Sequence, residues 1–227
     1  MANHEISMEL IINTHNFLTA VDNNVAIAVA AVIIDRVAMW SLGKYHSLST
    51  ATTNFVTTHN NLTSRNDSLI SAYLAGWLGA SSANDYKSMA ELLANNSYLT
   101  ALGNNATLMT LLNANSACYN AIANNLDSVL KLGNNTFLNA CSGKSTIIST
   151  INNNSSACTA IVNNISEAIA ATTFWTICCT QTNIMTAVAA SSTAMTAVAA
   201  SSTAMTAIGG TQIAMDAIWG SAYATII

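Results

Sequence analysis

The sequence predicts a mainly α-helical protein, with a small helical head followed by an elongated shaft built from a ten-residue repeat. Two observations carry this prediction. The decapeptide MTAVAASSTA occurs twice in succession from Met185, and a variant, MTAIGGTQIA, follows it. The 227 residues are 52% hydrophobic but only 6% aromatic and 7% charged, so large side chains are too few for a thick core and thin, repetitive packing is expected.

The repeat extends well beyond its obvious copies. An apolar residue recurs at every tenth position from Tyr98 to Ile218, and Ser128 is the exception. We therefore expect the repeat to run from about residue 95 to the end of the sequence. The predicted segments are a head at 1–90, an Asn-rich shaft at 91–182 and an Ala/Ser/Thr/Met array at 183–227.

Spacings within each decad favour helices over strands. The inward candidates lie about 3 or 4 residues apart, whereas a strand would alternate with a period of 2. Glycine is scarce and Asn-Gly turns are absent, which leaves a β-solenoid as the less favoured alternative. Ten residues fall about 80° short of three helical turns. The shaft is therefore either one overwound, supercoiled helix or a chain of short helices with Ser191 and Ser201 as N-caps.

A single narrow helix would expose its apolar stripe, so the pattern predicts a homo-oligomer, most simply a three-fold coiled-coil-like bundle. One polar residue per decad would then form layers that fix the register of the bundle. The alternative is that the Asn-Asn pairs are turn residues between short helices. The predicted seam consists of Leu108, Cys118, Leu138, Ile148, Cys158, Val188, Met195, Val198, Met205, Ile208 and Ile218, and the predicted polar layers consist of Asn105, Asn115, Asn125 and Asn135.

The head has helical spacing without a clear decad. Helices are expected over residues 5–21, 24–40 and 68–82, and over 85–96 with Asp85 as a candidate cap. The apolar run at 25–34 is about half as long as a membrane span requires. The start of the sequence lacks the pattern of a secretory signal.

No group of residues predicts a catalytic, cofactor or metal site. The head histidines, His4, His15, His46 and His59, have none of the spacings that metal ligands or catalytic pairs show. A net charge of −4 without a basic patch argues against nucleic acid as a partner. Cysteines in the repeat are expected as small apolar core residues. The alternative for Cys178 and Cys179 is a disulfide between chains.

The stretch MTAVAASSTAMTAVAASSTAMTAI resembles the decapeptide arrays of bacteriophage tail-fibre and related virion structural proteins. The resemblance covers residues 183–218. It implies a non-enzymatic, trimeric fibre, fibre base or connector on a virion that is assembled in the host cytoplasm. Other virion proteins would bind the head, and a host-surface receptor is an optional further partner.

Two other classes of function stay open. An uncharged helical tail could act on membranes. An Ala/Thr-rich helix could bind ice, although successive threonines such as Thr196 and Thr206 would be rotated by about 80° on a straight helix.

Overall fold

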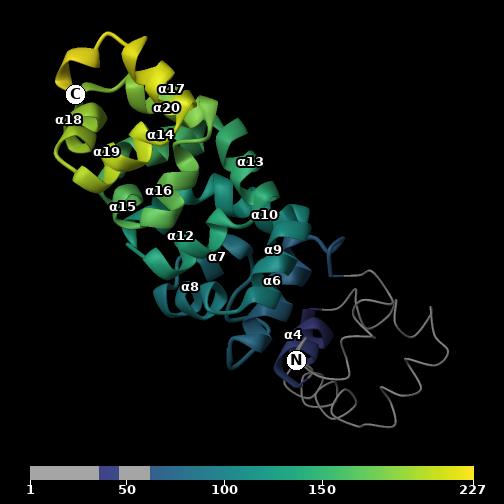
Figure 1. Ribbon diagram of the computed structural model, residues 1–227. Helices are drawn as coiled ribbons and strands as arrows, with labels where there is room; N and C mark the ends of the chain where they lie inside the picture. The colour runs from purple at the N-terminus through teal and green to yellow at the C-terminus, as the bar shows by residue number, and fades with distance from the viewer. Residues whose placement is uncertain (1–35, 46–61) are drawn as a thin grey trace. The chain divides into compact units, whose positions relative to one another are not determined.

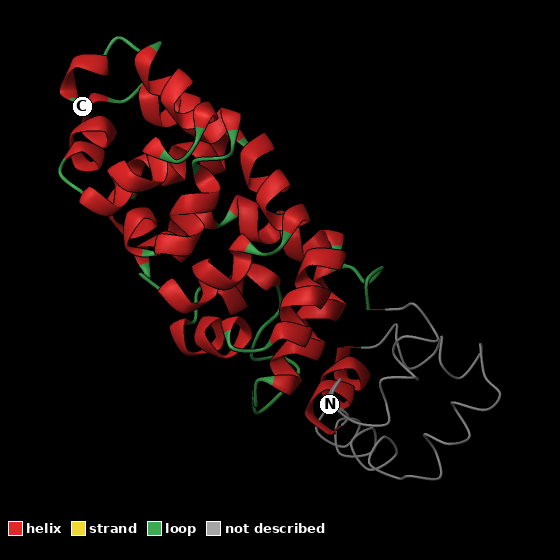
Figure 2. Ribbon diagram, viewed as in Figure 1, coloured by secondary structure: helices red, strands yellow, loops and turns green. Residues whose placement is uncertain are grey.

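The computed structural model describes residues 36–45 and 62–227, which are mainly α-helical and contain no strand (Figures 1 and 2). The chain divides into two compact units. The first comprises Met1–Leu92 with Ala114–Cys118, and the second comprises Leu93–Asn113 with Tyr119–Ile227. The predicted mainly α fold is confirmed for the described residues.

In the first unit, helices α4 (Arg36–Tyr45) and α6 (Asp67–Trp77) pack with their backbones in contact. A Cβ atom on Gly43 would lie 1.9 Å from the carbonyl oxygen of Tyr73, and one on Gly76 would lie 1.9 Å from that of Trp40. Only glycine permits this approach. The guanidinium of Arg36 supports the unit by donating to several backbone carbonyls, including Ala83 O and Tyr86 O at 2.6 Å each.

The helices expected in the head are found in part. Helix α6 confirms the one expected over 68–82, although it ends at Trp77. Over 85–96 only α7 (Met89–Leu93) forms before α8 begins. Asp85 does not cap α7, because its carboxylate accepts from Ser82 N–H, and the Ser88 hydroxyl accepts from Glu91 N–H instead. The helix expected over 5–21, and the part of the next before Arg36, lie outside the described residues.

From Asn96 onward, each decad forms one short helix and a tight turn. The helices are α8 (Asn96–Gly103), α9 (Ala106–Ala114), α10 (Ser116–Asn124), α11 (Leu126–Lys131), α12 (Asn135–Ser142), α13 (Ser145–Asn153), α14 (Ser155–Asn163), α15 (Ile165–Ala170), α16 (Thr172–Cys178), α17 (Thr182–Ala189), α18 (Ser192–Ala199), α19 (Ser202–Gly209) and α20 (Gln212–Trp219), followed by the 3₁₀ helix η1 (Ala224–Ile226). The structure thus decides between the two predicted forms of the shaft: it is a chain of short helices.

Polar side chains start these helices. Ser191 and Ser201 cap α18 and α19 as predicted, accepting from Ala194 N–H and Ala204 N–H at 3.2 Å. Asparagine does the same in the Asn-rich segment, where Asn95 caps α8, Asn134 caps α12 and Asn154 caps α14. Such caps satisfy backbone donors that have no partner inside the helix.

Many of these helices pack on a helix three or four places further along the chain. In the Asn-rich part α8 contacts α12 and α12 contacts α16, a step of four helices, whereas α11 contacts α14, a step of three. Towards the C-terminus the step is three helices: α14 contacts α17 and α17 contacts α20, while α15 contacts α18 and α16 contacts α19. Figures 1 and 2 show these stacked helices between α8 and the C-terminus. The second unit is therefore an α-solenoid, in which each turn contacts its neighbours.

Two sets of positions from 164 onward build the interior of this solenoid. The inner positions, whose numbers end in 4 or 8, carry residues such as Phe174, Val188 and Val198 and are buried. The stacking positions are those whose numbers end in 5 or 9. They are also buried in α15, α16 and α17, where they are Ile165, Ile169, Trp175, Cys179, Met185 and Ala189.

Candidate functional site

The predicted seam residues are buried within a single chain. Ten of the eleven have almost no exposed surface, and Met205 is half-buried. Their apolar surface is already removed from water by neighbouring turns of the same solenoid, which is the main stabilising contribution of such side chains. An oligomer of this chain therefore needs contact surfaces other than the ten buried positions.

The four predicted polar-layer residues lie in different surroundings within the chain. Asn105 caps α9 by accepting from Leu108 N–H at 3.0 Å. Asn125 donates to Ala121 O, and Asn135 is exposed at the start of α12. Their placement matches the alternative reading of asparagines as turn and helix-end residues, because each lies where one short helix gives way to the next.

Asn115 is the one buried member of this set, and its contacts lie within the first unit. Its side-chain oxygen accepts from Cys118 N–H at 3.0 Å, while its nitrogen donates to Leu62 O at 2.6 Å and Arg65 O at 3.0 Å. A buried amide with all these partners fixes the position of a loop.

Another set of asparagines, missed by the sequence argument, links successive turns. The carbonyl oxygen of the Asn152 side chain accepts from Asn183 N–H at 3.0 Å and Ile184 N–H at 3.3 Å, which lie 31 and 32 residues further on. Asn113 and Asn139 act in the same way on α13 and α16. Their oxygens accept from Thr146 N–H and Ile147 N–H, and from Thr173 N–H and Phe174 N–H, at 2.9–3.1 Å.

These cross-turn caps serve helices that lack a cap of their own. The residues before α13, α16 and α17 are Lys144, Ala171 and Gln181, and none of their side chains accepts from the helix it precedes. An asparagine in the previous turn therefore supplies the missing acceptor. The only sequence signal for this arrangement is an asparagine near the end of one helix. The sequence does not indicate which later helix that asparagine caps.

The five cysteines are free thiols inside the chain. Cys178 occupies an inner position and Cys179 a stacking position, and both are fully buried. This supports the expected role as core residues and leaves neither thiol exposed for a disulfide between chains. Burial raises the pKa of Cys141 and of Cys179 to about 12, so at neutral pH they are protonated and poorly nucleophilic.

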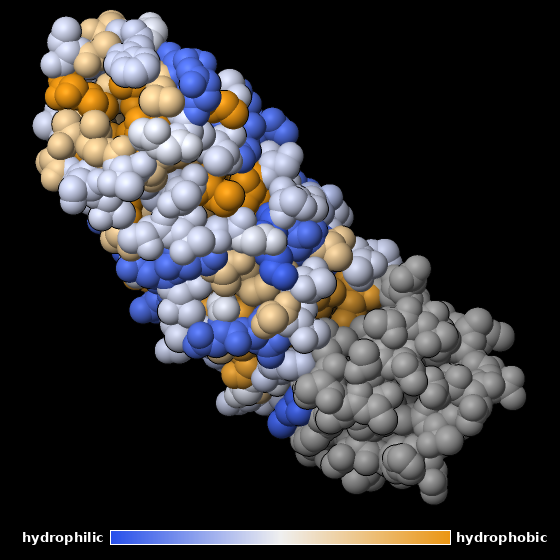
Figure 3. Space-filling model, viewed as in Figure 1, coloured by the Kyte–Doolittle hydropathy of each residue, from blue (hydrophilic) through white to orange (hydrophobic). Residues whose placement is uncertain are grey.

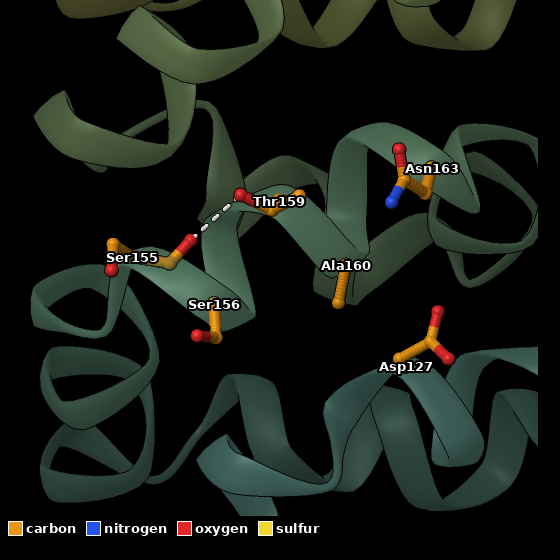
Figure 4. Close-up of a pocket in the computed structure, with 6 residues that line it drawn as sticks. All are labelled: Asp127, Ser155, Ser156, Thr159, Ala160 and Asn163. Atoms are coloured by element: carbon orange, nitrogen blue, oxygen red, sulfur yellow. Dashed lines mark hydrogen bonds between the residues drawn. The ribbon is translucent and has the colours of Figure 1, made fainter.

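A shallow polar pocket of about 240 Å³ lies between α11 and α14 (Figure 4). Its lining is Asp127, Ser155, Ser156, Thr159, Ala160 and Asn163. Asp127 is the one ionisable group of this lining, and it already binds Lys131 Nζ at 2.6 Å and Asn164 Nδ2 at 2.8 Å. The hydrogen bond from Lys131 lowers the pKa of Asp127 most, and the one from Asn164 lowers it further. The pocket pairs no nucleophile with a base.

The described residues contain no group of three or more His, Cys, Asp or Glu side chains that could hold a metal ion. The four head histidines lie outside these residues. Among the helices in 36–45 and 62–227, none has the length and apolar character needed to cross a membrane.

The threonines of the repeat lie on separate, stacked helices and not along one straight helix. Residues thirty apart occupy equivalent positions on stacked helices, so Thr173 and Thr203 are both exposed, as are Thr176 and Thr206, on α16 and α19. The expected rotation of about 80° between successive threonines therefore does not apply to these pairs.

Comparison with known proteins gave no match: no protein-family model, no curated protein and no solved structure matches the chain.

Proposed function

We propose that the chain is a non-enzymatic structural component of a bacteriophage virion, in which the solenoid serves as a stiff spacer within a fibre, fibre base or connector. The observation that carries this proposal is the cross-turn capping by Asn113, Asn139 and Asn152. Each turn positions the next through directional hydrogen bonds as well as apolar packing, and such a stack can hold two ends apart without a reactive site.

The surface of the solenoid agrees with this role. Ser, Thr and Asn cover most of its outer side, and few charges interrupt them. The resemblance of residues 183–218 to phage decapeptide arrays supplies the virion context. Buried thiols and a pocket whose carboxylate is already hydrogen-bonded favour a role in geometry over one in chemistry.

The proposed fibre contains more than one copy of the chain, and three copies is the number expected from the sequence. Because the predicted seam is buried within each chain, the copies would associate through other surfaces. Sedimentation analysis of the native complex gives the copy number directly.

Location on a particle tests the proposal. Particles from a host that makes this chain should contain it, as detected by mass spectrometry of purified virions. Gold label on an N-terminal tag should lie close to the particle, and label on a C-terminal tag further out, if the head docks. Absence of the chain from the particles would contradict a virion role, and the reverse order of the labels would contradict docking by the head.

The threonine pairs favour one second candidate, binding to ice. Thr173, Thr176, Thr203 and Thr206 present methyl and hydroxyl groups at equivalent places on stacked helices. A thermal-hysteresis measurement on the chain decides this candidate. Activity that is lost in Thr206→Lys would support ice binding, and no hysteresis would exclude it.

A further inference from the structure

Three consecutive decads of the solenoid have the same interior. Helices α18, α19 and α20 each carry alanine at the first inner position, methionine at the stacking position after it, and valine or isoleucine at the second inner position. The inner residues are buried in all three helices: they are Ala194, Val198, Ala204, Ile208, Ala214 and Ile218. The interior that each of these helices offers to its neighbours therefore differs by at most one methylene group.

The bends that join these helices repeat as closely. At Ala190, Ala200 and Gly210 φ lies between −82° and −74° and ψ lies between −10° and −1°. The residue after each bend is extended, with φ −115° and ψ 114° at Ser191 and φ −113° and ψ 111° at Ser201. Its N–H donates to the carbonyl three residues earlier, at 3.0 Å after each of the three bends. One turn geometry therefore joins any two of these helices.

Within this part of the chain, the side-chain hydrogen bonds are local. Over residues 185–219, which the structure describes throughout, each one joins residues three or four apart. Ser201, for example, accepts from Ala204 N–H, and Thr206 donates to Ser202 O. The contacts of α18, α19 and α20 with other turns therefore rest on apolar packing, which has no directional preference for one partner.

The Asn-rich turns differ in this respect, because particular side chains meet across them. Asn164 Nδ2 donates to Asp127 Oδ1 over a separation of 37 residues, at 2.8 Å. Asn154 Nδ2 donates to Asn124 Oδ1 over a separation of 30 residues, also at 2.8 Å. Further along, the bulky Phe174 fills the inner position that alanine takes in α18, α19 and α20. A decad inserted between such partners would separate side chains that fit only each other.

We propose that the segment from α18 to α20 sets the length of the solenoid. Decads that are added or removed there in groups of three lengthen or shorten the stack by one whole turn and leave the turns before it unchanged. The inference rests on the proposed role as a spacer and names the part of the chain that determines how far the spacer extends. The stability of a repeat stack is close to a sum over its repeats and their nearest-neighbour contacts, so a new turn with the same interior brings its own stabilising contacts.

Groups of three follow from the packing of this part of the chain. Helix α15 contacts α18, α16 contacts α19 and α17 contacts α20, so each helix stacks on the third helix after it. Three more decads return the chain to the same side of the stack, whereas one or two would move every later helix to another side. Added turns would also present an acceptable surface: Ser192, Thr196, Ser202 and Thr206 are exposed, and weakly polar surface covers much of the visible face in this region (Figure 3).

Inserting three further copies of MTAVAASSTA between Ala204 and Met205 of the full chain tests the proposal. Spin labels on Thr176→Cys and Thr206→Cys, in the numbering of the parent chain, report the separation of two helices on the same side of the stack. Stacked helices lie about 8–10 Å apart, so three copies should lengthen the distance between the labels by roughly that amount, and six copies by about twice as much. The urea concentration at the midpoint of unfolding should not fall.

The matched control is an insert of the same length and composition whose order places serine or threonine at the inner positions. It should add no regular turn and should lower the urea midpoint, because it buries hydroxyl groups without partners. A label distance that does not grow in equal steps, loss of helical circular dichroism in the three-copy variant, or the same gain in distance from the control insert would overturn the proposal. None of these results would remove the chain from virions, so failure of this inference is distinguishable from failure of the proposed function.

Discussion

Asparagine has two structural tasks in this chain, and they differ in reach. Asn95, Asn134 and Asn154 cap the helix that follows them, within three residues. Asn113, Asn139 and Asn152 cap a helix one solenoid turn away. The first task could be predicted from the sequence, because a polar residue before an apolar run is a local signal. The second could not, because the sequence does not say which turns become neighbours.

Replacing Asn152 by alanine tests the cross-turn cap. The change removes the acceptor for Asn183 N–H and Ile184 N–H and leaves the start of α17 without a cap. We expect the free energy of unfolding in urea to fall by about 1–2 kcal/mol. The Asn183 and Ile184 amides should also exchange faster with solvent.

The neighbouring residue provides the control for this experiment. Asn153 is exposed, and its side chain makes one long contact, to Ser149 Oγ at 3.5 Å. Asn153→Ala should change stability by less than about 0.5 kcal/mol. Equal effects of the two changes would show that the cross-turn cap contributes nothing specific.

The buried thiols predict a loss of stability at alkaline pH. An unfolded cysteine ionises near pH 8.5, whereas the pKa of Cys141 and of Cys179 is raised to about 12 by burial. Above pH 8.5 the unfolded chain therefore releases protons that the folded chain keeps. Stability falls as the pH rises through this range, by up to about 1.4 kcal/mol per pH unit for each thiol.

Urea denaturation in the presence of a reductant at pH 7.5, 8.5 and 9.5 measures this effect. This range stays below the ordinary pKa of tyrosine, about 10, so that Tyr73 does not contribute. The double variant Cys141→Ala/Cys179→Ala should be less stable at pH 7.5 but should show a shallower fall. A profile that is flat up to pH 9.5 would mean that the thiols are accessible to water in the folded chain.

At the scale of the element, the sequence indicates where the helices with a local polar cap start but not whether one helix continues into the next. The serines at 191 and 201 and the recurring apolar positions identified the unit of the repeat correctly. They left the continuous helix open, because a decad with spacings of 3 and 4 fits both forms. The bends after Ala190, Ala200 and Gly210 decide the matter. Alanine at such a bend carries no turn signal that sequence reasoning could use.

The contact between α8 and α12 depends on Gly103. A Cβ atom there would lie 2.8 Å from both the Cα and the nitrogen of Phe137, closer than real side chains approach backbone. Gly103→Ala should therefore separate the two helices and lower the free energy of unfolding by about 1–3 kcal/mol.

Gly143→Ala is the matched change for this test. Gly143 ends α12 with a negative φ of −83°, and an added Cβ atom would have no neighbour within 4 Å. The free energy of unfolding of the Gly143→Ala variant should stay within about 0.5 kcal/mol of that of the parent chain. If thermal melts show that Gly103→Ala lowers stability no more than Gly143→Ala does, α8 and α12 do not approach each other this closely.

For the second unit as a whole, the main consequence is that one chain covers its own apolar stripe. The sequence argument assumed that a narrow helix must find its partners in other chains, and the same positions that it assigned to a seam are buried between turns of the solenoid. Periodicity cannot separate these outcomes, since both place an apolar residue at every tenth position. The distinction lies in contacts thirty residues apart, such as those between α16 and α19.

The distance between residues 176 and 206 tests this account most directly. Both are exposed threonines, and the native cysteines are buried, so spin labels attached to Thr176→Cys and Thr206→Cys would report on this pair alone. Stacked helices place their axes about 8–10 Å apart, and the labels should therefore lie within roughly 20 Å of each other. A continuous helix would separate the two positions by about 45 Å, at about 1.5 Å per residue. A separation near that value, in a chain whose circular dichroism is unchanged, would contradict the solenoid.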